Sequence, residues 1–242
     1  MINNENSQSR FLRQLDIVPP EKLGFPITVI GAGAIGSAVV VTLAKMGCTD
    51  ITVWDNDRLD DVNIPNQLCK PSMVGSLKVD ALAELVEELT EIEIKKISRR
   101  YCGQYLEGVI IIAVDTMTTR LNAWKRIKLN PKIPLLIDAR MGAEFARIYT
   151  IHPMNIVETD FYEHNLYNGD EAEHLPCSGR SIIYCPTVIA GLVTLIIKQY
   201  AVNHPVPREI LIDLPQFVLQ CTREGEIHGS SFLQPDESLH AV

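Results

Sequence analysis

Three glycines have the spacing of a phosphate-binding turn. Gly31, Gly33 and Gly36 form the pattern Gly-x-Gly-x-x-Gly directly after the apolar run 27–30. Such a turn lets the backbone approach a phosphate at the start of a helix, where free N–H groups and the helix dipole favour negative charge. A tight structural turn is the alternative, so the surrounding sequence has to decide.

An acidic residue follows at the end of the next apolar run. Residues 51–54 read Ile-Thr-Val-Trp and lead directly into Asp55, which completes a strand–helix–strand unit of the usual length. A carboxylate in this place commonly binds a ribose hydroxyl, in NAD-binding and ATP-binding proteins alike. The glycine turn and Asp55 therefore predict a nucleotide site without choosing between NAD and ATP.

Three linked motifs narrow the choice of nucleotide. They are Asp55-x-Asp57, then Val62-Asn63-Ile64-Pro65-Asn66-Gln67, then Gly75-Ser76-Leu77-Lys78-Val79. Together they resemble the ATP-binding stretch of the ThiF/MoeB/HesA adenylating enzymes, the prokaryotic relatives of ubiquitin-activating enzymes. The resemblance implies an ATP site that contains Asp57, Asn66 and Gln67, with Asp55 on the ribose, Asn63 near the phosphates and Lys78 on the triphosphate.

Lysine at the position of Lys78 suits this role chemically, because an ammonium group can offset charge on the leaving pyrophosphate. Taken without the surrounding motifs, Lys78 would be an ordinary solvated helix residue.

Two further motifs extend the resemblance. Arg10-Phe11-Leu12-Arg13-Gln14 resembles an element whose second arginine reaches the active site of the partner subunit, which implies that Arg13 acts in trans in a homodimer. Ala113-Val114-Asp115-Thr116-Met117, followed by Arg120, resembles the strand-end aspartate of the family. This implies that Asp115 binds the Mg²⁺ that accompanies ATP and supports attack on the α-phosphate. A frayed basic arm and a helix N-cap are the alternative interpretations.

The sequence departs from the family pattern at Asn66. The family usually reads Asn-x-x-Arg-Gln, whereas this chain reads Asn63-Ile64-Pro65-Asn66-Gln67. Loss of a cation that stabilises phosphoryl charge puts catalysis in question. Either Lys70 or Arg58 compensates, or the protein is slow, specialised or inactive.

The six cysteines contain no Cys-x-x-Cys pair, so we expect no zinc site. Cys177 lies where sulfur-transfer and protein-conjugating relatives place a reactive cysteine, and a thiolate there could accept the adenylated carboxylate. His174 or Arg180 could lower its pKa. An inert thiol is the alternative, and Cys185, which leads into an apolar helix, is a weaker candidate.

The alternation of apolar strands and helices along the sequence predicts the fold. Strands are expected over residues 27–30, 51–54, 109–114, 134–138, 146–151 and 217–221, and helices follow the first three of them and occupy residues 181–200. This order indicates an α/β, Rossmann-like doubly wound sheet, mostly parallel with antiparallel strands at the C-terminal side. We expect an N-terminal arm (1–22), an adenylation domain (23–224) with a crossover loop at about 153–180, and a polar tail (225–242).

The composition and net charge argue against some classes of binding partner. The chain has 242 residues, 46% hydrophobic, with a net charge of −8, which argues against binding to nucleic acid or an anionic membrane. Its polar start lacks the order of a secretory signal, so we expect a cytoplasmic protein. The longest apolar stretch, 187–197, is too short for a membrane span and is interpreted as a buried helix.

The resemblance implies ATP-dependent adenylation of the C-terminal carboxylate of a small ubiquitin-like or sulfur-carrier protein with a flexible tail. Two alternatives stay open. A non-catalytic ATP-binding partner subunit would explain Asn66. An NAD-dependent oxidoreductase would explain the glycine turn and Asp55, but it leaves Asn63, Lys78 and Arg13 without a purpose.

Overall fold

An eight-stranded sheet organises the described part of the chain. The computed structural model describes residues 10–167 and 181–222. The strand order is β3-β2-β1-β4-β5-β6-β7-β8. The strands are β1 (Ile27–Ile30), β2 (Ile51–Trp54), β3 (Lys95–Ile97), β4 (Val109–Ile112), β5 (Leu136–Gly142), β6 (Phe145–Ile151), β7 (Glu209–Asp213) and β8 (Val218–Thr222). The first five strands pair in parallel and the last three pair antiparallel, which confirms the predicted fold class.

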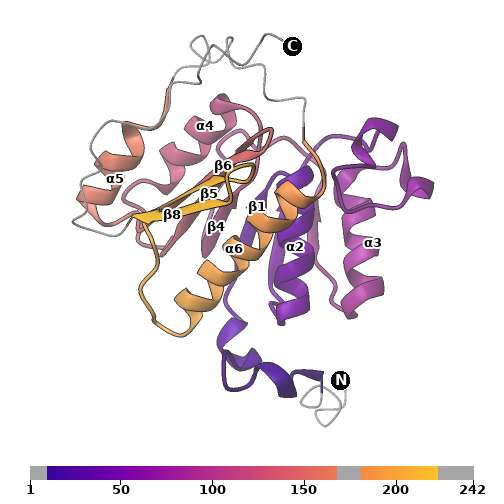
Figure 1. Ribbon diagram of the computed structural model, residues 1–242, viewed down its shortest axis with the longest axis horizontal. Helices are drawn as coiled ribbons and strands as arrows, with labels where there is room; N and C mark the ends of the chain where they lie inside the picture. Colours follow the sequence, from indigo (N-terminus) through magenta and orange to yellow (C-terminus); the bar gives the residue numbers. More distant parts are fainter. Residues whose placement is uncertain (1–9, 168–180, 223–242) are drawn as a thin grey trace.

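Helices cover both faces of this sheet (Figure 1). The α-helices are α2 (Ala34–Met46), α3 (Lys78–Thr90), α4 (Met117–Ile127), α5 (Ile156–Glu163) and α6 (Tyr184–Ala201). The 3₁₀ helices are η1 (Leu12–Gln14), η2 (Pro20–Leu23), η3 (Asp61–Asn63) and η4 (Pro71–Met73). Helices α2, α3 and α6 share one apolar cluster with the sheet, whereas α4 and α5 share a second cluster on the opposite face.

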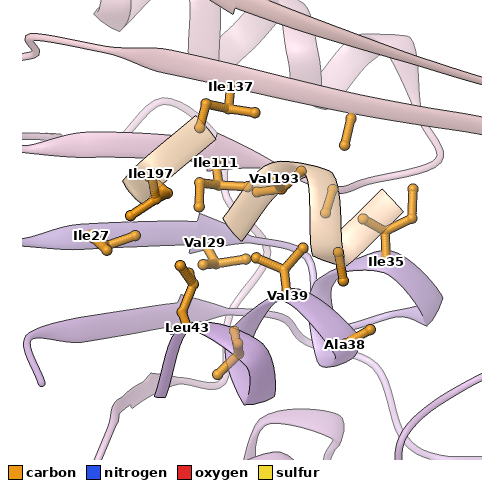
Figure 2. Close-up of a cluster of buried hydrophobic side chains, with 14 of the residues drawn as sticks. Ile27, Val29, Ile35, Ala38, Val39, Leu43, Ile111, Ile137, Val193 and Ile197 are labelled. Atoms are coloured by element: carbon orange, nitrogen blue, oxygen red, sulfur yellow. The ribbon is translucent and has the colours of Figure 1, made fainter. Parts of the chain in front are cut away.

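The central strands are apolar at every position because both of their faces are covered. All four residues of β4 are buried, with Val109 and Ile111 in one cluster and Ile110 and Ile112 in the other. Figure 2 shows how side chains of β1, β4 and β5 meet those of α2 and α6 in the first cluster. This packing fixes the carboxyl ends of the parallel strands at one edge of the sheet, where open α/β sheets bind their ligands.

Helix α6 is buried on one face only. Its residues Ile189, Val193 and Ile197 are fully or almost fully buried, but Tyr184 and Leu195 are 42% and 48% exposed. The expectation of a buried helix is therefore right for the inner face and wrong for the outer one. By length and composition α6 is the one helix in the described part of the chain that would suffice to cross a membrane, although its inner face packs on α2 and β5 as a core helix does.

Two elements differ from the sequence-based expectation. The stretch expected to be a crossover loop contains α5, which begins where the Asn155 side chain accepts hydrogen bonds from the N–H groups of Val157 and Glu158. Strand β7 was not predicted, and it places β8 at the edge of the sheet rather than beside β6.

Candidate nucleotide-binding site

The glycine turn joins β1 to α2 at the carboxyl edge of the sheet. Gly31 has a φ of +103°, and a Cβ at this position would lie 2.4 Å from the carbonyl oxygen of Ala113. A Cβ at Gly36 would lie 1.9 Å from the carbonyl oxygen of Gly31. Both glycines are therefore required by close backbone packing.

Gly33 has a different environment. A Cβ at Gly33 would meet no protein atom within 4 Å. Gly33 is also the N-cap of α2, and no side chain caps this helix. The first N–H groups of α2 thus remain available above an open backbone, which is the arrangement that binds a phosphate.

Asp55 braces the same turn. One of its carboxylate oxygens accepts a hydrogen bond from the Ala32 N–H at 2.7 Å, and the other accepts one from the Asp57 N–H at 2.7 Å. A carboxylate oxygen retains acceptor capacity after one such bond, so Asp55 still suits a ribose hydroxyl. The structure brings Asp55 to the glycine turn, as the sequence predicts.

Lys78 is not a solvated helix residue. Its side chain is only 12% exposed, and its Nζ lies 3.2 Å from Asp57 Oδ2. Its backbone N–H also bonds to the Asp57 carbonyl oxygen at 2.9 Å. These contacts hold the first residue of α3 beside the end of β2.

Asn63, Asn66 and Gln67 belong to the loop between β2 and α3. Asn63 Oδ1 accepts a hydrogen bond from the Asp60 N–H at 2.9 Å, which leaves the Asn63 amide NH₂ as a donor. Further along, the Leu68 N–H bonds to Ser37 Oγ in the first turn of α2 at 3.2 Å. The loop therefore lies against the helix that follows the glycine turn.

Asn66 and Gln67 each carry a buried side-chain oxygen without a hydrogen-bond partner among the described residues. Asn66 Nδ2 donates to Ser181 Oγ at 2.8 Å. Buried acceptors without partners are uncommon and call for a donor from a ligand or water. Both oxygens therefore make this loop a candidate ligand contact.

Both proposed substitutes for the missing arginine already have partners within the described chain. Lys70 pairs with Glu84 and Glu88 on α3, and Arg58 Nη1 donates to the Gly75 carbonyl oxygen at 2.7 Å. The suggestion that Lys70 or Arg58 compensates for Asn66 is not supported by these contacts. Among the predicted site residues that the structure describes near the turn, Lys78 is the cation.

Asp115 follows β4 directly beside the glycine turn, because Gly31 packs against Ala113. The N-cap of α4 is Thr116, so the interpretation of Asp115 as a helix N-cap is wrong. The Asp115 side chain is exposed and free of hydrogen bonds and ion pairs to the rest of the described chain. A hard carboxylate oxygen in this position fits Mg²⁺ shared with nucleotide phosphates, which Mg²⁺ prefers to an all-protein cage.

Arg13 lies at the opposite end of the domain. Its neighbour Gln14 donates from Nε2 to the Met46 carbonyl oxygen at 2.8 Å, at the C-terminal end of α2. The glycine turn lies at the other end of this 13-residue helix, about 20 Å away at the helical rise per residue. Arg13 therefore does not reach the site of its own chain.

Of the two candidate cysteines, the structure describes Cys185 but not Cys177. Cys177, with His174 and Arg180, lies outside the described residues, so the role of Cys177 stays a prediction. Cys185 is fully buried, and desolvation by burial raises the pKa of its thiol. This environment disfavours the thiolate and does not suit a nucleophile.

Sequence reasoning missed a buried ionic cluster behind Asp115. Asp138 on β5 is fully buried, and its two carboxylate oxygens accept hydrogen bonds from Arg120 and Arg140 at 3.0 and 2.8 Å. The Tyr162 hydroxyl on α5 adds a third bond at 2.9 Å. The signal in the sequence is Asp138 at the end of the apolar run 134–137, because a carboxylate on a buried strand needs buried partners.

Comparisons with known proteins identify the family. A model of the ThiF family matches residues 23–217. The uncharacterized protein y4qC of Sinorhizobium fredii is 28% identical over 176 residues, which cover 69% of this chain and 27% of that protein. The chain thus spans about a quarter of the length of this curated relative.

Solved structures share the fold. Escherichia coli MccB, solved with AMPCPP and MccA, gives a TM-score of 0.69 at 19% identity over 91% of this chain and 72% of that one. PaaA gives 0.71 at 17% identity over 89% of this chain and 72% of that one. MccB solved with ATP gives 0.70 at 17% identity, over 91% and 71%. The family match covers most of the sequence, and the chain belongs to the ThiF family.

Proposed function

We propose that the protein uses ATP to adenylate the C-terminal carboxylate of a small ubiquitin-like or sulfur-carrier protein, or of a peptide with a similarly flexible end. A carboxylate oxygen attacks the α-phosphorus, the bond to pyrophosphate breaks, and an acyl-adenylate forms. The observation that carries the proposal is the meeting of an uncapped glycine turn, Lys78 and an uncommitted Asp115 at one sheet edge.

The roles follow from the local chemistry. The N–H groups at the start of α2 suit the phosphates, and the Lys78 ammonium suits charge on the leaving pyrophosphate. Asp115 would hold the Mg²⁺ that accompanies ATP, and this ion would neutralise phosphate charge. MccB, which has the same fold, was solved with ATP and with AMPCPP together with MccA, and this supports a nucleotide and a second substrate here.

A second candidate is an ATP-binding subunit that does not catalyse. It is favoured by Asn66, which bonds to Ser181 where the family pattern has an arginine. Lys70 and Arg58 are engaged elsewhere, so neither takes the place of the missing arginine. Membership of the ThiF family argues against the oxidoreductase alternative.

Exchange of labelled pyrophosphate into ATP tests the two candidates. The adenylating enzyme should incorporate label only when a suitable carrier is present. Asp115→Ala should lower the rate by at least about 100-fold, as loss of a group that stabilises transition-state charge does. Lys70→Ala, which removes a cation that pairs with Glu88 on α3, should leave the rate within about twofold. ATP binding without exchange for any carrier would favour the non-catalytic subunit.

We further propose a homodimer in which Arg13 completes the partner's site. Arg13 is too far from its own glycine turn, so any role in the reaction requires a second copy. The outer face of α6 supplies an apolar stripe for that copy: Tyr184, Val188 and Leu195 are exposed, with Gly191 between them. Exposed apolar stripes of this kind mark interaction surfaces.

The direction of α6 supports the same arrangement. Its C-terminal end lies near the end of the arm, because α6 contacts η2 and Tyr200 contacts Phe25 with ring centroids 5.2 Å apart. Its N-terminal end lies near the site, because Ser181 bonds to Asn66. Antiparallel pairing of two α6 helices about a two-fold axis would bring the arm of each subunit toward the site of the other.

Mixed variants test this dimer. Arg13→Ala and Asp115→Ala should each be nearly inactive, because an arginine finger contributes roughly 10³-fold or more. After the two are mixed and allowed to exchange subunits, half of the dimers should be mixed and hold one complete site each. Activity should then return to about a quarter of the wild-type value for an isologous dimer. Full activity of Arg13→Ala alone, or no recovery in the mixture, would contradict the proposal.

A further inference from the structure

We propose that Arg120, held by the buried carboxylate of Asp138, is a positioning residue that fixes the place of Asp115. The inference rests on the proposed function, since it concerns the residue that would hold Mg²⁺ with ATP. It assigns a task to the ionic cluster, which otherwise serves only stability.

Arg120 links two strands through one guanidinium group. Its side chain is 6% exposed, and its Nε donates to Asp138 Oδ1 on β5 at 3.0 Å. Its Nη2 donates to the carbonyl oxygen of Val114 after β4. This carbonyl belongs to the peptide bond that leads into Asp115. The guanidinium therefore bridges the interior of β5 and the backbone immediately before Asp115.

Asp115 has no side-chain contact of its own to hold it. Its carboxylate is exposed and makes no hydrogen bond or ion pair within residues 10–167 and 181–222. The neighbouring Thr116 does not cap α4 with its side chain, and its hydroxyl bonds to the Thr119 hydroxyl at 2.8 Å. The place of Asp115 is thus set by the backbone that precedes it, where Arg120 bonds to Val114 and Gly31 packs against Ala113.

The Asp138 carboxylate gives Arg120 a rigid anchor. Asp138 is fully buried and also accepts hydrogen bonds from Arg140 Nε and from the Tyr162 hydroxyl. Arg140 stacks over the Tyr149 ring at 4.6 Å and donates from Nη1 to the Asn165 carbonyl oxygen at 2.8 Å. A buried network in which each carboxylate oxygen has partners holds its members in one geometry. Elements β5, α4 and α5 together therefore position the turn that carries Asp115.

Arg120→Lys tests whether the positive charge of Arg120 or its hydrogen-bonding geometry positions Asp115. The lysine ammonium group can still neutralise Asp138, but as a compact point charge it cannot reproduce the fork that bonds Asp138 and Val114 at once. Arg126→Lys is the matched control, because Arg126 lies on the same helix, is exposed, and donates from Nε to the Gly103 carbonyl oxygen instead.

The experiment measures ATP affinity with Mg²⁺ and with EDTA, on the full chain. Wild type should bind ATP more tightly with Mg²⁺, and Asp115→Ala should lose this gain. Arg120→Lys should keep the EDTA affinity and lose roughly tenfold or more of the Mg²⁺ gain, as changes behind a metal ligand do. Arg126→Lys should keep both values.

A second variant guards against simple unfolding. Tyr162→Phe removes one hydrogen bond to Asp138 and no charge, so it should fold and should reduce the Mg²⁺ gain less than Arg120→Lys does. An unchanged Mg²⁺ gain in Arg120→Lys, with wild type behaving as expected, would overturn this inference alone. Absence of ATP binding by wild type would instead overturn the proposed function, and this inference with it.

Discussion

Replacement of Gly36 by alanine is expected to abolish nucleotide binding. The added Cβ would lie 1.9 Å from the carbonyl oxygen of Gly31, so the backbone of the turn must move. Since the N–H groups that would bind phosphate belong to this turn and to α2, we expect ATP affinity to fall by at least about 100-fold. Isothermal titration calorimetry on the purified variant checks the affinity, and its melting temperature reports damage to the fold.

Gly33→Ala is the informative companion to this variant. A Cβ at Gly33 meets no protein atom within 4 Å, so the melting temperature should stay close to that of the wild type. If a phosphate occupies the open space above Gly33, the same methyl group should weaken ATP binding roughly tenfold or more. Normal ATP affinity in Gly33→Ala would show that the nucleotide does not approach this part of the turn.

Asp138→Ala is expected to be the most destabilising single change in the ionic cluster. It would leave Arg120 and Arg140, whose side chains are 6% and 16% exposed, without their carboxylate partner. Removal of one partner from a buried ion pair typically costs about 3–5 kcal/mol, because an uncompensated charge stays buried. The free energy of unfolding in urea measures this loss.

Asp50→Ala is the control, because it removes an ion pair that lies on the surface and is not buried. Asp50 pairs with Lys95 at 2.8 Å on the surface, where their side chains are 37% and 69% exposed. Its replacement should cost less than about 1 kcal/mol. Equal losses for Asp50→Ala and Asp138→Ala would mean that the cluster does not contribute to stability in the way its burial indicates.

The stability contributed by Asp138 should also depend on pH. Burial alone would raise the pKa of Asp138, but the Arg120 and Arg140 guanidinium groups outweigh burial and hold it below the ordinary value of 3.8. Because the pKa is lower in the folded state, this contribution is complete above pH 3.8 and is lost as the pH falls below it toward the folded-state value. The difference in unfolding free energy between wild type and Asp138→Asn should shrink over that range.

The local order of the fold could be predicted from the sequence. An apolar run, a glycine turn and a helical repeat identify β1 and α2, and Asp55 marks the end of β2, because period and turn chemistry are local properties. Helix α5 was missed although Asn155 followed by Glu158 is a helix-start signal, because the polar residues around it resembled a loop. Strand β7 was missed because its five residues follow a proline-rich segment and give a short pattern.

Only part of the arrangement of the site can be predicted from local sequence. Asp55, Lys78 and the glycine turn come together because strand ends meet at one sheet edge, a rule that the sequence order already implies. The cluster around Asp138 draws Arg120 from α4 and Tyr162 from α5, and no spacing rule predicts contacts between such separate elements. The distance of Arg13 from its own site likewise depends on how the arm packs at the far end of α2.

The most direct test of the central claim is to measure ATP binding and pyrophosphate exchange in the same preparation, for wild type and for Asp115→Ala. Wild type is expected to bind ATP and to incorporate labelled pyrophosphate when a carrier with a free C-terminal tail is added. Asp115→Ala, which removes an exposed carboxylate without a hydrogen bond or ion pair in the described chain, should stay folded and lose the exchange. Undiminished exchange in Asp115→Ala would show that adenylation does not depend on Asp115.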